Sequence, residues 1–78
     1  MLQRAALSAG RCAAVADSAA STFEHLAITY RKMAGNARTP EKATRMLRHA
    51  GRVESLALGE RAEAVRFRLQ LLRQAIFS

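Results

Sequence analysis

The chain has 78 residues, enough for one small domain, and half of its residues are apolar. Thirteen Lys and Arg against six Asp and Glu give a net charge of +7, which favours acidic or anionic partners. No apolar run approaches the roughly 18 residues of a membrane span, and a single cysteine excludes an intramolecular disulfide. We interpret Cys12 as a small buried hydrophobe in a reducing, cytoplasmic protein.

Apolar residues recur at alternating intervals of three and four along the first 33 residues. This spacing puts them on one face of a helix, so we expect a long α-helix over about residues 3–34. The face is small in its first half and bulky in its second half, which indicates close packing against another helix. Its members are Leu2, Ala5, Ala9, Cys12, Ala16, Ala19, Phe23, Leu26, Tyr30 and Met33.

Two short segments inside this helix have the sequence of a helix start. One is Asp17-Ser18, and the other is Ser21 with Glu24 at capping-box spacing. The helix could therefore be broken near residues 17–21, which would give three helices in all. Residues 1–16 contain two Arg, many Ala and no acid, as a mitochondrial presequence does. Because they carry the apolar face without a break, we expect no cleaved targeting segment.

The turn signals are concentrated between residues 34 and 40. Gly35 suits the left-handed end of a helix, Thr39 suits a helix cap, and Pro40 suits the first helical position. We therefore expect a turn at residues 35–39 and a second helix over about residues 40–76. The predicted fold is all-α, an antiparallel hairpin of two long helices forming one domain over residues 1–78.

The second helix carries two apolar stripes in its C-terminal half. We expect Phe23, Leu26, Tyr30 and Met33 to pack on its first half, through the seam Ala43, Met46, Ala50, Val53 and Ala57. After Gly59 the seam is expected to shift phase, to Leu58, Ala62, Val65, Leu69, Leu72 and Ile76. The second stripe lies far round the helix and consists of Ala64, Phe67, Leu71 and Ala75, with Arg66 and Arg73 beside it.

One neighbouring helix covers only one of these stripes. We therefore predict that the second stripe binds another protein, in a hetero-complex or a homo-oligomer. The predicted function is that of a non-enzymatic helical adaptor or co-chaperone.

No set of residues has the pattern of a catalytic centre. His25 and His49 lack neighbours at metal-ligand spacing, and the four glycines form no phosphate loop, so we expect no cofactor or metal. One basic face follows the start of the second helix at intervals of three, four and three, and could track a phosphate backbone or an acidic protein. A nucleic-acid-binding protein of phage or plasmid origin is therefore an alternative, with Lys42, Arg45, His49 and Arg52 as its contacts.

The turn and the start of the second helix resemble the small helical co-chaperones of type III secretion needle subunits, the YscE/PscE type. The matching segments are Tyr30–Gly35, Pro40–Lys42, Leu47, Ala50 and Val53–Leu56. The resemblance covers about thirty residues and implies two partners, a repeat-fold chaperone and a needle subunit, and no chemistry. The apolar run 65–77 and the strong basic charge depart from that family. Needle and inner-rod subunits of the same apparatus are also short hairpins with a proline in the turn, so a self-assembling subunit is the first alternative and the nucleic-acid-binding protein is the second.

Overall fold

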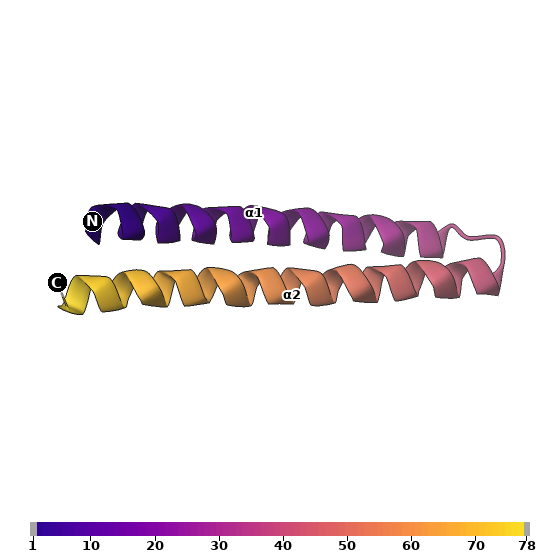
Figure 1. The fold of residues 1–78 in the computed structure, drawn as a ribbon. Coiled ribbons are helices and arrows are strands. Elements are labelled where there is room, and N and C mark those ends of the chain that lie inside the picture. Colours follow the sequence, from indigo (N-terminus) through magenta and orange to yellow (C-terminus); the bar gives the residue numbers. More distant parts are fainter. Residues whose placement is uncertain (1, 78) are drawn as a thin grey trace.

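The protein is a hairpin of two long helices. A computed structural model describes the backbone of residues 2–77 and the side chains of residues 8–77. Helix α1 spans Leu2–Gly35 and helix α2 spans Pro40–Phe77, and the two run antiparallel along their whole length (Figure 1). The expected all-α hairpin is confirmed. The rod measures 59 × 13 × 12 Å, with both ends of the chain at the open end opposite the turn.

Helix α1 is continuous through residues 17–21. The Asp17 carboxylate does not cap a new helix because it pairs with Arg61 and Arg68 of α2. The Thr22 hydroxyl donates a hydrogen bond to the Ser18 carbonyl 3.1 Å away, inside an unbroken helix. The two-helix form of the prediction therefore holds for the described backbone. No helix in this part of the chain is long and apolar enough to cross a membrane.

The turn is closed by a threonine cap. The Lys42 amide donates to the Thr39 hydroxyl at 3.2 Å, and the Ala43 amide donates to the Thr39 carbonyl at 3.1 Å, as the sequence predicted. The expectation of a left-handed Gly35 is wrong, since no residue of the described backbone has a positive φ. Helix α1 instead ends with an ordinary helical hydrogen bond, which the Asn36 amide donates to the Lys32 carbonyl.

The two helices meet along a seam of alanines, which we call the inner seam. Every fully buried residue among the described side chains is an alanine; they are Ala9, Ala13, Ala16, Ala20, Ala27, Ala50, Ala57 and Ala64. Larger seam residues such as Phe23, Tyr30, Val53, Phe67 and Leu71 are half-buried at the edges of the contact. The hairpin therefore buries little large apolar surface of its own.

The inner seam of α1 differs from the predicted face at every second position. Ala13, Ala20 and Ala27 are buried, whereas Leu26 is 38% exposed and Met33 is 44% exposed. The prediction that Leu26 and Met33 lie on the packing face is therefore wrong. Cys12 and Ala19 lie half-buried beside the seam, and the side chains of Leu2 and Ala5 lie outside the described residues. At Cys12-Ala13 and Leu26-Ala27 the smaller residue takes the inner position because it allows the helix axes to approach more closely.

Two contacts fix the register of the hairpin. The rings of Tyr30 and His49 lie 5.2 Å apart, and a methyl group placed on Gly10 would lie 3.9 Å from Leu71 Cδ1. In this register Phe67 lies beside the small side chains of Ala9 and Cys12. Small residues thus face the large Phe67 ring, whereas near the turn the two rings of Tyr30 and His49 pack against each other.

This packing predicts effects of different size for two neighbouring alanines. Ala13→Leu should lower the free energy of unfolding by about 1–3 kcal/mol, because the added carbons meet the facing helix in a filled seam. Ala14→Leu is the matched control, since Ala14 is exposed on the same turn, and it should change stability by less than about 0.5 kcal/mol. Chemical denaturation followed by circular dichroism measures both. Equal effects of the two changes would contradict the seam.

Candidate protein-binding surface

A second apolar stripe runs along the back of α2, facing away from α1. Its residues follow one another at intervals of four and three, so they line one face of the helix over its C-terminal half. The five large members are between 50% and 74% exposed, and the small one is exposed as well. We call this the outer stripe; it consists of Leu58, Ala62, Val65, Leu69, Leu72 and Ile76.

The inner seam of α2 continues past Gly59 without a change of phase. It runs through Ala43, Met46, Ala50, Val53, Ala57, Glu60, Ala64, Phe67, Leu71 and Gln74, all buried or half-buried. The predicted phase shift is therefore wrong. Its cause is Glu60, a charged residue at a seam position, which interrupts the apolar pattern in the sequence. Glu60 lies at the edge of the helix contact near Ala16 and is only half-buried, so its carboxylate keeps access to water.

The two stripes of α2 are consequently interchanged relative to the prediction. Ala64 is fully buried, and Phe67 and Leu71 lie half-buried against α1, so these three belong to the hairpin contact. Ala75 is exposed at the end of the helix. Phe67 and Leu71 were predicted to bind a partner because no helix was expected to cover them. Since α1 partly covers both, this reason does not hold. The uncovered stripe is the outer stripe, although the apolar pattern of the sequence predicted it as the face that packs on α1.

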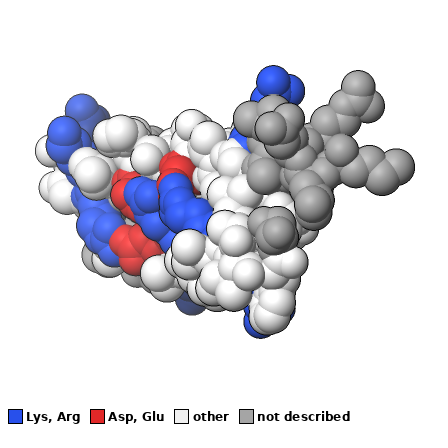
Figure 2. All heavy atoms as spheres, turned by 90° about the vertical axis from the view of Figure 1, so that its left-hand side faces the viewer, with Lys and Arg blue, Asp and Glu red and all other residues white. Residues whose placement is uncertain are grey.

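One side of the hairpin carries a ladder of ion pairs between the helices. Arg61 donates to Asp17 at 3.1 Å and to Glu24 at 3.0 Å, and Arg68 also pairs with Asp17. Nearer the turn the signs are reversed, with Arg31 of α1 paired to Glu54 of α2. Figure 2, which looks at the open end, shows blue and red side chains interleaved on one flank beside a white surface.

The ladder also changes the acidity of its central carboxylate. The hydrogen bond from Arg68, together with the positive charges of Arg68 and Arg61, holds the pKa of Asp17 below its ordinary value of 3.8. In return, the hydrogen bond and charge of Glu24 raise the pKa of Arg61. Asp17 is therefore ionised at neutral pH and fixes both arginines over α1.

The edge of the outer stripe that lies away from the ladder has fewer ion pairs. Arg66 lies 3.0 Å from Glu63 within the same helix, and its side chain remains 73% exposed. Arg73 forms no ion pair with any residue between 8 and 77 and is exposed. The two arginines predicted to border the binding surface thus do border an apolar stripe, although a different one.

The basic face predicted at the start of α2 is only partly on the surface. Lys42, Arg45 and Arg52 are exposed, but His49 turns inward and packs against Tyr30. Arg48 joins the exposed cations and lines a shallow hollow with Arg45 beside the turn. Seven of the 13 cationic residues and one of the six acids lie between residues 31 and 52, so the turn end carries most of the net charge.

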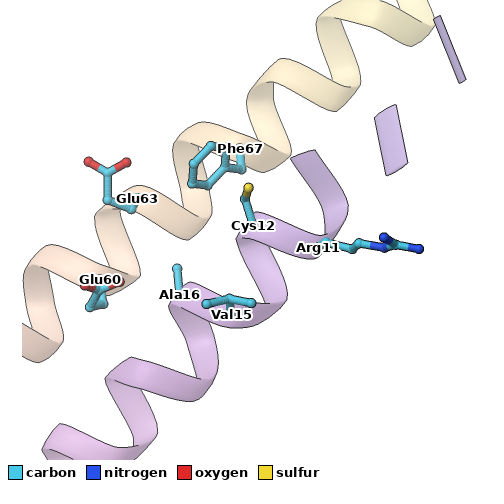
Figure 3. Close-up of a pocket in the computed structure, with 7 residues that line it drawn as sticks. All are labelled: Arg11, Cys12, Val15, Ala16, Glu60, Glu63 and Phe67. Carbon is cyan, nitrogen blue, oxygen red and sulfur yellow. The ribbon is translucent and has the colours of Figure 1, made fainter. Parts of the chain in front are cut away.

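An apolar hollow opens between the helices on the side away from the ladder (Figure 3). It is lined by Arg11, Cys12, Val15, Ala16, Glu60, Glu63 and Phe67. The Cys12 side chain points toward the Phe67 ring, while Arg11 points away from the hollow. Cys12 is half-buried, close to its predicted role as a small hydrophobe. Between residues 8 and 77 no three His, Cys, Asp or Glu residues gather as metal ligands would.

Comparison with protein-family models, with characterised proteins and with solved structures finds no match for this chain. The candidate site is therefore identified from the geometry of the hairpin alone. Its main feature is the outer stripe with arginines along both edges.

The ladder predicts how stability depends on pH. Because the folded pKa of Asp17 lies below its unfolded value, its charge stabilises the hairpin above the unfolded pKa, near 3.8, and this stabilisation disappears as the pH falls through the lowered folded value. Asp17→Asn should lower the midpoint of thermal unfolding by a few degrees at pH 7, and the difference should vanish in acid below both values.

Glu63→Gln provides the control for this measurement, since the ion pair of Glu63 within residues 8–77 is with Arg66 of the same helix. We expect a smaller shift for it at pH 7. Equal shifts for the two variants, or a loss for Asp17→Asn that persists in acid, would contradict a stabilising ladder between the helices.

Proposed function

We propose that this protein is a non-enzymatic helical adaptor that binds another protein through the outer stripe of α2. The observation that carries the proposal is a second heptad seam, Leu58 to Ile76, on the face of α2 opposite α1. A helix with apolar stripes on opposite faces satisfies one stripe with the hairpin and needs a further neighbour for the other.

The spacing of the outer stripe favours a helical partner. Residues at alternating intervals of three and four present a row of knobs and holes that matches another helix, whereas a small molecule needs a concave pocket. Burying a Leu, Val or Ile contributes about 1.5–3 kcal/mol per side chain. Leu69 and Leu72 at the middle of the stripe are therefore the expected centre of the interface.

The composition of the inner seam supports the same proposal. A hairpin whose fully buried described residues are all alanine gains little from its own core, and small folds of this kind often depend on a partner. A co-chaperone of a type III secretion needle subunit is the specific form that the resemblance at the turn suggests. Such a protein would work in the cytoplasm, where Cys12 stays reduced.

The charge at the turn end favours nucleic-acid binding as a second candidate function. Arg45, Arg48 and Arg52 project from successive turns of α2, with Lys42 and Arg38 nearby. Cations in such a row can follow a phosphate backbone, with affinity that falls steeply as salt is added. This function would use the opposite end of the rod and would leave the outer stripe free.

The proposal predicts that two substitutions in the outer stripe abolish partner binding. Leu69→Asp with Leu72→Asp should leave the helical circular dichroism unchanged, because both side chains face away from α1. The double variant should lose the partner that the unchanged chain retains from extracts of its source organism, as measured by native mass spectrometry. Val15→Asp with Ile28→Asp is the matched control, since both residues are exposed apolar residues of α1.

Three results would contradict this proposal. Retention of the partner by the stripe variant would place the interface elsewhere, and unfolding of that variant would place the stripe in the core. Growth of the purified chain alone into filaments, seen by light scattering, would favour a self-assembling subunit.

A further inference from the structure

The residues that border the outer stripe are basic on both sides. Arg66 and Arg73 directly follow stripe residues, as does Gly59, and Arg61 and Arg68 directly precede them, as does Ala75. Four of these six bordering positions are therefore arginine, and none is acidic. We infer that the outer stripe binds an acidic amphipathic helix, with Asp and Glu along both edges of its own apolar seam. This inference rests on the proposed function.

The positions of these arginines argue against a second copy of the chain as the occupant. When two helices pair through heptad seams, the residues that border one seam face those that border the other. In a parallel pair, Arg66 and Arg73 of one copy would face Arg61 and Arg68 of the other. In an antiparallel pair, each edge would face its own equivalent. Both arrangements bring arginine against arginine, whereas a helix with acidic borders avoids this repulsion and offers ion-pair partners to Arg66 and Arg73, which form no ion pair with α1 within residues 8–77.

Within the hairpin, the edge of the outer stripe with Arg61 and Arg68 already pairs with acidic side chains of a neighbouring helix. The helix that lies beside Arg61 and Arg68 offers Asp17 and Glu24, and the arginines bond to both acids. On the other edge, Arg66 has only Glu63 of its own helix, and Arg73 has no ion pair within residues 8–77. The edge with Arg66 and Arg73 is therefore where we place the strongest contacts of the partner's acids.

A line of arginines extends this edge toward the turn. Arg45, Arg52, Arg66 and Arg73 share one helical position, with Gly59 completing the seven-residue spacing. Seven residues rise about 10.5 Å along a helix, so a partner helix with an acid every heptad meets each of these cations in turn. Arg45 and Arg52 are exposed, so an acidic helix longer than the stripe would gain further contacts.

An anionic membrane fits this surface less well than an acidic helix. The outer stripe is only two helical positions wide, and the ladder beside it carries three carboxylates, Asp17, Glu24 and Glu54. A flat anionic surface would approach these acids together with the arginines, whereas a single helix contacts only the stripe and its borders. The test must therefore distinguish binding to a membrane from binding to a helical partner.

Two designed peptides test the inference on the full chain. Both are helices of about three heptads with the same Leu and Ile seam, one with Glu at every bordering position and the other with Lys. Fluorescence anisotropy should show the Glu peptide binding at least about tenfold more tightly than the Lys peptide. Arg66→Glu with Arg73→Glu should reverse this preference. Lys32→Glu with Arg38→Glu, the same charge change at the turn end, should leave the preference in place.

The remaining outcomes separate the inference from the proposed function. Equal binding of both peptides, abolished by Leu69→Asp with Leu72→Asp, would overturn the acidic partner and keep the stripe as a binding surface. Binding of neither peptide would overturn both. A doubled mass of the chain without peptide, lost in the same stripe variant, would make a second copy the occupant. Binding to phosphatidylserine vesicles but to neither peptide would make it a membrane.

Discussion

The close approach of two helices across a seam of alanines is the constraint from which the other features of this protein follow. Alanine at Ala16, Ala20, Ala57 and Ala64 leaves room only for the backbone of the facing helix. Large apolar residues do not fit in this contact, so the chain places most of them on its outside. The same close approach brings Arg61 and Arg68 of α2 within reach of the acids of α1.

The helices and the turn were predictable from the sequence because their signals are local. Apolar spacing of 3.5 residues predicts a helix wherever its exact phase lies, and Thr39 with Pro40 marks a helix start from neighbouring residues alone. The phase of the inner seam was harder to predict. At Leu26-Ala27 two apolar residues stand side by side, and hydrophobicity favours the leucine whereas helix packing distance favours the alanine. Packing distance depends on the facing helix and is not visible in the local sequence.

The phase of the apolar pattern was also the part of the candidate site that was hard to predict. The sequence revealed that α2 carries two apolar stripes bordered by arginines, and this is correct. Which stripe faces inward was assigned wrongly, because Glu60 at a seam position made the sequence pattern change phase. Its half-burial at the edge of a thin contact could not be known without α1 in place. His49 was likewise grouped with surface cations by its spacing, although Tyr30 holds it inward.

The two faces of α2 therefore have separate tasks in this account, one for the hairpin and one for a partner. Hydroxyl-radical footprinting of the chain with and without its native partner tests this division most directly. We expect Leu69 and Leu72 to be modified readily in the isolated chain and to be protected in the complex, while Phe67 and Leu71 keep the same low reactivity in both. Protection of Phe67 and Leu71 on binding, with Leu69 and Leu72 unchanged, would contradict it.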